Sequence, residues 1–342
     1  GFIRKMDRLA PNENVVGYLV PFGVWGVIAP FNFPMALSAG MAAGALVTGN
    51  TVVYKPSSDA PWTGTLLNKV FMDAGLPDGV FNLLNGAGSI IGEGLVTNNN
   101  VDGLVFTGSK TVGMDIYHRF SKQYPKPCII EMGGKNPAIV TQNGNLDIAA
   151  EGIMRSAFGF GGQKCSACSR AYIEQSVFHE FLDLLIHKSK SLIIGNPTDR
   201  DTFLGPLINA KAYHDFQSYV ESAHKDGTVL TGGKLCTHST LDNGFFVEPT
   251  IITDLDENHP LVKSELFCPI LYIRPVKNLA EALTFANDTE YGLTAGFFSE
   301  DQGEIDLFFN TIRAGVTYVN RRSGATTGAW PGVQPFCGWQ SS

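Results

Sequence analysis

Short β-branched runs alternate with helix-length segments along the first part of the chain, and this alternation constrains the fold more than any other feature. Short buried strands separated by helix-length connections are typical of a parallel sheet with helices on its faces. The sequence therefore predicts an α/β fold between residues 15 and 135. The expected strands are 24–29, 51–55, 80–84 and 104–107, and the expected helices are 34–46, 61–74, 89–96 and 112–123.

A second strand and helix series begins near residue 136 and predicts a second α/β domain. With 342 residues, of which 44% are hydrophobic, the chain is long enough to bury two cores. The Gly-rich, polar stretch 231–249 reads as a surface loop. The expected strands are 138–141, 171–174, 295–298 and 315–320, and the expected helices are 177–191, 210–223 and 280–287.

Composition narrows the class of partner. The net charge is −7 and Lys and Arg form no run, which argues against a nucleic-acid surface and for a small-molecule ligand. The longest weakly polar stretch, 34–49, is short for a bilayer span, so we expect no membrane segment. Six irregularly spaced cysteines indicate free thiols and a reducing compartment, the cytosol by default and an organelle matrix as the alternative.

Cys165 is the strongest candidate for a reactive group. It lies in GGQKCSACSR, residues 161–170, behind a Gly-Gly turn and next to Lys164. An exposed turn with positive charge nearby favours the thiolate, so we predict a nucleophile. The alternative is a redox or metal CxxC formed with Cys168. It is disfavoured because a metal site needs a second pair, and the other cysteines are scattered singly.

Polar residues follow three of the predicted strands, where open α/β sheets bind their ligands. The segment 106–113, FTGSKTVG, ends a strand, turns at Gly108 and Ser109 and opens a helix. The N–H groups of such a helix start suit a diphosphate, although the same pattern occurs at ordinary strand–helix turns. Lys55 follows another strand and either reaches a ribose or phosphate or is simply solvated.

Glu131 ends the apolar segment CIIE ahead of a Gly-Gly pair. Burial of a carboxylate raises its pKa toward that of a useful general base. A structural salt bridge is the alternative, and Glu131 alone does not decide between the two.

Taken together, the order and intervals of six residues resemble the aldehyde dehydrogenase superfamily along nearly the whole chain: Asn32, Lys55, Ser109, Glu131, Cys165 and Glu265. The resemblance implies an α/β fold with a Rossmann-type cofactor domain, an α/β catalytic domain and part of a β-arm used in oligomerisation. The implied boundaries are 1–20 for the arm, 21–134 for an NAD(P)-binding domain incomplete at its N-terminus, 135–320 for the catalytic domain and 321–342 for a substrate-anchor loop and return segment.

The resemblance also implies catalytic roles. Cys165 would attack an aldehyde, and Asn32 with the cysteine N–H would form the oxyanion hole. Hydride would pass to the cofactor, and Glu131 would activate the water that hydrolyses the resulting thioester. No metal is implied.

The implied cofactor is NAD. Lys55 would bind the adenosine ribose, the Gly108–Ser109 turn the pyrophosphate, and Glu265 and Phe267 the nicotinamide ribose and ring. Ser58 stands where many NAD-preferring relatives carry a glutamate that grips the ribose, so NADP stays open as an alternative.

Two motifs point further, to the branch of the family that oxidises glutamate γ-semialdehyde, the open form of 1-pyrroline-5-carboxylate, to glutamate in proline breakdown. They are GGQKCSACSR and TGAWPGVQPF, residues 327–336. The resemblance implies that the N–H groups of Gly328 and Ala329 and the Ser166 hydroxyl receive the substrate carboxylate. Phe33 and Phe336 would flank its methylenes. Gly324–Ala325 is a rival for the Gly328–Ala329 role.

The sequence departs from the family pattern at two positions, and alternative functions stay open. Cys268 and Cys337 stand where the family usually has glycine, which puts the shape of the pocket in question. The alternatives are a dehydrogenase for another aldehyde, such as succinate semialdehyde, and a catalytically silent member of the fold. The resemblance further implies a homo-oligomer, a dimer or larger, and a chain incomplete at both ends that binds cofactor poorly alone.

Overall fold

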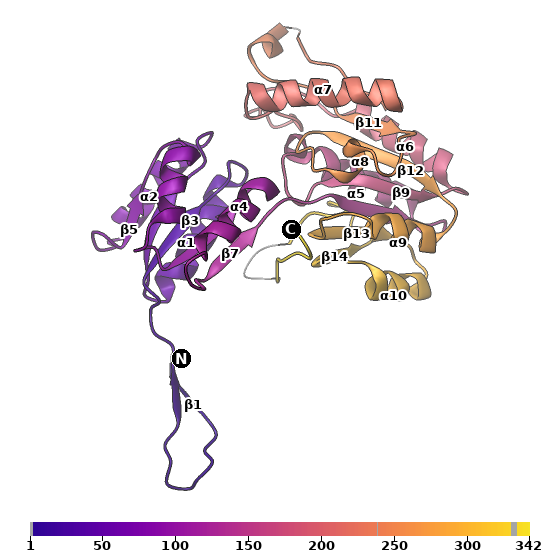
Figure 1. Cartoon of the computed structure of the whole chain (residues 1–342). Helices are drawn as coiled ribbons and strands as arrows, with labels where there is room; N and C mark the ends of the chain where they lie inside the picture. The colour runs from indigo at the N-terminus through magenta and orange to yellow at the C-terminus, as the bar shows by residue number, and fades with distance from the viewer. Residues whose placement is uncertain (1–2, 238, 330–333) are drawn as a thin grey trace. The chain divides into compact units, whose positions relative to one another are not determined.

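The computed structural model describes residues 3–237, 239–329 and 334–342. The chain forms two compact units, Gly1–Glu131 and Met132–Ser342. Each unit contains a sheet with helices packed on it (Figure 1). The predicted fold class, α/β in both parts, is confirmed, whereas the domain boundary expected between residues 134 and 135 stays a prediction.

The sheet of the first unit has five strands in the order β5–β4–β3–β6–β7, and every neighbouring pair is parallel. The chain runs outward from β3 through β4 to β5 and then returns to β6 on the other side of β3. In open α/β sheets, ligands bind outside the carboxyl ends of the strands where the order reverses in this way. The strands are β3 (Val24–Ile28), β4 (Thr51–Lys55), β5 (Phe81–Leu83), β6 (Gly103–Thr107) and β7 (Cys128–Glu131).

Helices cover both faces of this sheet because consecutive strand residues point to opposite sides. Val27 packs in a cluster with residues of α1 and α2, and its neighbour Ile28 packs with residues of α3 and α4. The helices are α1 (Pro34–Val47), α2 (Pro61–Asp73), α3 (Glu93–Thr97), preceded by the π-helical turn η1 (Gly88–Gly92), and α4 (Lys110–Phe120). Among the described residues, no helix is long and apolar enough to cross a bilayer.

Two further strands of the first unit, β1 (Ile3–Lys5) and β2 (Val16–Tyr18), form a separate antiparallel pair. Ile3 and Tyr18, which are partners in this pair, are 63% and 64% exposed. An exposed two-stranded ribbon has little core of its own and gains stability when another element covers it.

The sheet of the second unit has seven strands in the order β10–β11–β12–β9–β8–β13–β14. Only the edge pair β10 and β11 is antiparallel, and the other neighbours are parallel. The strands are β8 (Asn136–Val140), β9 (Cys168–Glu174), β10 (Thr228–Thr231), β11 (Thr250–Thr253), β12 (Ile270–Val276), β13 (Thr294–Phe298) and β14 (Val316–Val319).

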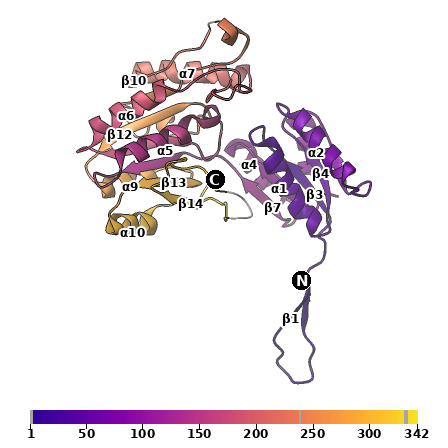
Figure 2. The same cartoon turned by 180° about the vertical axis from the view of Figure 1, so that it is seen from behind.

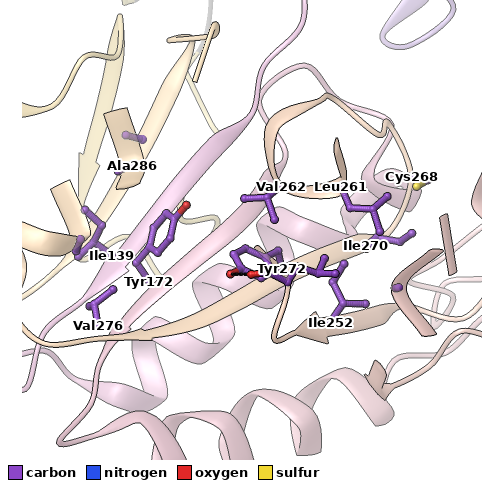
Figure 3. Packing of buried hydrophobic residues seen from close by; sticks show 14 of the residues in the cluster. Ile139, Tyr172, Ile252, Leu261, Val262, Cys268, Ile270, Tyr272, Val276 and Ala286 are labelled. Atoms are coloured by element: carbon purple, nitrogen blue, oxygen red, sulfur yellow. Dashed lines mark hydrogen bonds between the residues drawn. The ribbon is translucent and has the colours of Figure 1, made fainter. Parts of the chain in front are cut away.

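Helices cover both faces of this sheet (Figures 1 and 2), and one hydrophobic core lies on each face. Ile139 and Tyr172 belong to the core that packs against α7, α8, α9 and α10, and part of this core is drawn in Figure 3. Their neighbours Ala138 and Ile173 face α5 and α6. The helices are α5 (Leu146–Phe158), α6 (Phe178–Lys190), α7 (Ala210–Asp226), α8 (Pro260–Lys263), α9 (Leu279–Asn287) and α10 (Gln302–Thr311), with short 3-10 turns η2 (Gly159–Gly162) and η3 (Ser239–Asn243).

The prediction of a plain surface loop at 231–249 is wrong in one respect. Cys236, Leu241 and Phe246 are buried together and form a small core of their own. Polar and glycine content indicated a loop, but three separated apolar side chains are enough to fold it onto itself.

Candidate active site

Cys165 lies in a tight turn between η2 and β9, and it is partly exposed. The approach to it is a run of left-handed backbone, with φ of 60° at Phe160, 64° at Gly161 and 67° at Gly162. Gln163 braces this run because its side-chain amide donates to the Phe160 carbonyl and accepts from the Ile208 N–H at 2.9 Å. The Gly-Gly turn expected ahead of the cysteine is therefore present.

Lys164, expected as a nearby positive charge, is not an ordinary surface cation. Burial lowers the pKa of its ammonium to about 8, and the charge of the Cys165 thiolate acts in the opposite direction. A lysine that holds its proton only loosely is a weaker fixed charge than the sequence pattern suggested.

Cys168 differs sharply from Cys165. Its side chain is 1% exposed, its thiol donates to the Arg170 carbonyl at 3.5 Å, and burial raises its pKa to about 12. None of the six cysteines forms a disulfide. The CxxC pattern thus contains one reachable thiol and one core residue.

Glu265 and Phe267 lie between α8 and β12. The Glu265 carboxylate accepts a 3.0 Å hydrogen bond from the Gly134 N–H, and burial raises its pKa to about 7. Phe267 has φ of 55°, a left-handed conformation that turns the chain sharply ahead of β12.

Cys268 packs into the core. It is 6% exposed and lies in the cluster with Leu261 and Ile270, as Figure 3 shows. The sequence raised the question whether the Cys268 side chain changes the shape of a binding pocket. In the structure this side chain fills volume in the hydrophobic core.

The loop after β14 is tied to the turn that carries Cys165. Thr326 is fully buried, and its hydroxyl donates to the Ser166 carbonyl at 2.6 Å. The hydroxyls of Thr326 and Ser156 are 2.7 Å apart, so Ser156 is left to donate to Thr326. Ser166 itself is partly exposed.

The rival pair Gly324–Ala325 is not available to bind an anion through its amides. The Ala325 N–H donates to the Gly152 carbonyl at 2.9 Å, and the Gly324 N–H points to the Arg321 carbonyl at 3.4 Å. Both groups already serve the backbone, which leaves the later pair as the candidate.

Of that later pair, the Ala329 N–H donates to the Tyr318 hydroxyl at 2.8 Å. Gly328 has φ of 127° and lies against the guanidinium of Arg321, whose Nε donates to the Thr327 carbonyl. A Cβ on Gly328 would come within 2.1 Å of Arg321 Nη2. The predicted loop therefore has one engaged amide and a cation beside it, which the sequence reasoning missed.

The rest of the predicted anchor loop is only partly described. Residues 330–333 lie outside the described residues, and Phe336 is half-buried. Cys337, the other departure from the usual glycine, is exposed.

In the first unit, Asn32 and Phe33 follow β3 and precede α1. Asn32 is only 3% exposed, and no hydrogen bond joins its amide to another described residue. The Asn32 amide is not among the fully buried polar atoms that have no hydrogen-bond partner in the described part of the chain, so it keeps some access to solvent or ligand. Phe33 has φ of 48° and is 44% exposed.

Lys55 ends β4 and is 4% exposed, so it is not the solvated lysine of the alternative reading. Its ammonium donates to the Pro56 carbonyl at 2.6 Å, and burial lowers its pKa. Ser58, three residues on, is exposed, and its hydroxyl is 3.4 Å from the Gly86 carbonyl.

Gly108 and Ser109 connect β6 to α4. The Gly108 N–H donates to the Glu131 carbonyl at 3.1 Å, which fixes the start of the turn. Ser109 takes the N-cap position of the eleven-residue helix α4, but its side chain does not cap the helix. The helix start therefore keeps backbone donors for an anion.

Glu131 is the last residue of β7, paired with Thr107 of β6. Burial raises the pKa of its carboxyl to about 7. The sequence left a salt bridge open as the alternative, and no salt bridge to Glu131 occurs among the described residues.

The first unit thus gathers Asn32, Lys55, Ser109 and Glu131 at the carboxyl ends of its parallel strands, and the second unit gathers Cys165, Ser166 and Thr326 in one loop cluster. Sequence reasoning missed Thr326, Arg321 and Asn136. Asn136 and Thr326 contact residues 29 and 160 positions away, whereas Arg321 contacts Thr327, only six residues on.

Comparison with known proteins assigns the class. The model of the aldehyde dehydrogenase family matches residues 3–342, and the chain belongs to this family.

Two similar relatives are 1-pyrroline-5-carboxylate dehydrogenases. The protein of Geobacillus sp. (strain WCH70) is 40% identical over 337 residues, which are 97% of this chain and 64% of the relative. That of Bacillus subtilis (strain 168) is 41% identical over 348 residues, 99% of this chain and 66% of the relative. The chain therefore spans about two thirds of the length of these relatives.

Solved structures of aldehyde dehydrogenases are similar to this chain. A 1-pyrroline-5-carboxylate dehydrogenase from Thermus with bound NAD is 37% identical, with a TM-score of 0.89 over 94% of this chain and 62% of that one. A betaine aldehyde dehydrogenase from Staphylococcus aureus in complex with NAD+ has a TM-score of 0.94 at 30% identity, covering 100% of this chain and 66% of that one. The fold is shared by both, and the sequence identity is higher to the first.

Proposed function

We propose that this chain belongs to an NAD(P)-dependent dehydrogenase that oxidises glutamate γ-semialdehyde to glutamate through a thioester on Cys165, in proline breakdown. The observation that carries the proposal is the hydrogen bond from Thr326 to the Ser166 carbonyl. It joins the turn of the candidate nucleophile to the loop that bears the candidate carboxylate-binding amides. The higher identity to 1-pyrroline-5-carboxylate dehydrogenases supports the same substrate.

In the proposed reaction, the Cys165 thiolate attacks the aldehyde carbon. A C–S bond forms, and the carbonyl electron pair moves to oxygen, where the Asn32 amide would stabilise it. When bound, the nicotinamide cofactor accepts the hydride that the carbon must lose. Glu131 then removes a proton from water as the water attacks the thioester, the C–S bond breaks, and the thiolate and the carboxylate product are released.

The residues present fit a nicotinamide dinucleotide. Ser109 leaves the start of α4 uncapped by its side chain, which suits a diphosphate. Lys55 is a buried ammonium with one carbonyl partner and donors to spare for ribose oxygens. Gly108 and Ser58 would line the same ligand, and Glu265 and Phe267 would hold its nicotinamide end.

The substrate carboxylate would be received by the Gly328 N–H and the Ser166 hydroxyl, and by the Ala329 N–H once it leaves the Tyr318 hydroxyl to which it now donates. Arg321, beside Gly328, adds a positive charge that would attract the substrate carboxylate. Phe33 and Phe336 would flank the methylenes.

We further propose that the protein acts in the cytosol as a homo-oligomer that uses the exposed β1–β2 pair. Unpaired thiols suit a reducing compartment, and an exposed ribbon is a natural site for pairing with a second copy.

The direct test is reduction of NAD and of NADP by the protein at its full natural length, with glutamate γ-semialdehyde as substrate and Cys165→Ala as control. We expect turnover with this aldehyde to exceed turnover with succinate semialdehyde and simple alkanals. Equal rates across the panel would remove the substrate assignment, and no turnover with any aldehyde would leave a silent member of the fold.

A further inference from the structure

The side chain of Asn136 reaches the turn that carries Cys165. Asn136 is the first residue of β8 and is 2% exposed. Its Nδ2 donates to the Cys165 carbonyl at 2.7 Å and to the Ala167 carbonyl at 2.8 Å. Its Oδ1 accepts from the Thr294 N–H at 3.0 Å. The two N–H groups of this one side-chain amide thus donate to the backbone carbonyls of the residues on either side of Ser166.

An irregularity in the sheet explains why a side chain, and not the backbone, donates to these carbonyls. The register of β8 against β9 shifts between Asn136 and Pro137, and a proline has no N–H for the ladder. The backbone ladder therefore does not continue smoothly toward Cys165 at this point. The Asn136 amide supplies donors to carbonyls just ahead of β9.

Close packing at Gly134 keeps this arrangement in place. A Cβ on Gly134 would lie 2.3 Å from the Cys165 carbonyl oxygen and 2.7 Å from Asn136 Oδ1. Only glycine leaves room for the carbonyl and the amide to approach together.

The buried guanidinium of Arg170 fixes the peptide that precedes Asn136. Arg170 is fully buried, and it donates to the Lys135 carbonyl from Nε at 3.0 Å and from Nη2 at 2.7 Å. It also donates to the carbonyls of Phe285 and Ala286 in α9. The peptide that leads into Asn136 is therefore anchored through Arg170 to α9.

The whole turn is constrained as a result. The Lys164 carbonyl accepts from the Ala167 N–H at 3.0 Å, and the Ser166 carbonyl accepts from Thr326. Together with the two carbonyls held by Asn136, four successive carbonyl oxygens, those of residues 164 to 167, have fixed partners.

We propose that Asn136 is a positioning residue for Cys165, which orients the 164–167 turn so that the thiolate points toward the reacting carbonyl. The proposal rests on the proposed function only in taking Cys165 as the nucleophile. Asn136 itself does not touch substrate or cofactor in this role; it acts through the Cys165 carbonyl.

The test compares Asn136→Ala and Asn136→Ser with Asn50→Ala. Asn50 is a matched control because it is also a buried amide, 6% exposed, with Oδ1 accepting from two backbone N–H groups and Nδ2 donating to the Ala45 carbonyl. It belongs to the first unit, whereas the Cys165 turn belongs to the second. The Ser variant keeps one donor and carries the test if the Ala variant does not fold.

Two readouts are measured on folded protein: kcat with the aldehyde, and the rate of Cys165 alkylation by iodoacetamide as a function of pH. We expect Asn136→Ala to lower kcat about a hundredfold, as a misplaced reacting group does, with KM for the cofactor nearly unchanged. The alkylation rate and its pH profile should change, and Asn136→Ser should fall between.

Asn136 variants with parental kcat and parental alkylation would overturn the proposal, as would equal losses in Asn136→Ala and Asn50→Ala. Alkylation needs neither substrate nor cofactor, so this outcome is separate from failure of the proposed function. That failure would appear as aldehyde oxidation surviving in Cys165→Ala.

Discussion

The hydroxyl of Thr326 lies 2.6 Å from the carbonyl oxygen of Ser166 and donates to it across 160 residues of sequence. A single hydrogen bond thus connects the residue after the candidate nucleophile with the segment that leads to Gly328. A shift of either segment relative to the other would break this hydrogen bond.

Replacing Thr326 with Val removes that donor while keeping the shape of the side chain. We expect KM for the aldehyde to rise several-fold and the free energy of unfolding to fall by about 1–3 kcal/mol, since the Ser166 carbonyl loses a buried partner. Steady-state kinetics and urea unfolding measure the two effects. Thr284→Val is the matched control, because Thr284 donates to a carbonyl on the exposed side of α9, and a KM equally raised there would contradict the argument.

Cys165→Ala should lose at least about a thousandfold in kcat, on the scale of removing a covalent nucleophile. Cys168→Ala should keep most of its activity, because that thiol is buried and serves only the Arg170 carbonyl. Cofactor reduction and peptide mapping after iodoacetamide treatment check both. A Cys168 variant as inactive as the Cys165 variant would point instead to a joint role of the two thiols.

The raised pKa of Glu131, about 7, predicts an acidic limb in the pH profile of kcat. The carboxyl must be ionised to accept a proton, so activity should fall as pH drops through about 7. Glu131→Gln should give a burst of reduced cofactor followed by slow turnover, because the thioester forms but is not hydrolysed.

Glu265 has a similarly raised pKa and is the control for that limb. In Glu265→Gln the acidic limb should persist. Its disappearance there would assign the limb to Glu265.

Lys164 predicts a dependence of stability on pH. Its pKa is lowered from 10.5 to about 8 in the folded chain, so unfolding takes up a proton between these values and stability rises with pH across that window. At neutral pH the penalty is fully present. Lys164→Met should therefore raise the free energy of unfolding at pH 7 by up to about 3 kcal/mol, with the gain shrinking as pH rises from about 8 to 10.5.

Urea unfolding at several pH values tests this, with Lys190→Met, an exposed lysine at the end of α6, as control. A gain in stability that does not vary with pH would show that apolar packing, and not proton release, is the cause.

Ser58→Glu should shift cofactor choice. Ser58 is exposed three residues after Lys55, so a carboxylate there would repel the 2′-phosphate of NADP. We expect KM for NADP to rise about tenfold or more while KM for NAD stays level or falls. An equal change for both cofactors would place Ser58 away from the ribose.

The sequence predicted the strands that are continuous β-branched runs, such as β4, because such runs leave few other structures open. It did not indicate α5, whose segment Leu146–Phe158 is rich in small residues and interrupted by Gly152. There the backbone approaches the Arg321 carbonyl, a tertiary contact that no local pattern carries.

The sequence likewise indicated some residues of the candidate site and not others. The identity of Cys165, Glu131 and Lys55 was visible because each stands at the end of a predicted strand or turn. Asn136 and Thr326 were not visible, because a hydrogen bond to a carbonyl 29 or 160 residues away depends on how strands are ordered in the sheet. The lowered pKa of Lys164 depends on burial and was equally hidden.

The burial of Cys168, Cys236 and Cys268, with the raised pKa of Cys128, has a practical consequence for labelling chemistry. Cys128, Cys165 and Cys337 are the cysteines that are at least partly exposed, and burial raises the pKa of the Cys128 thiol to about 11. A Cys337→Ser protein would therefore present a single addressable sulfur to a fluorescent electrophile, and the dye would report directly on ligand occupancy beside the Thr326 loop.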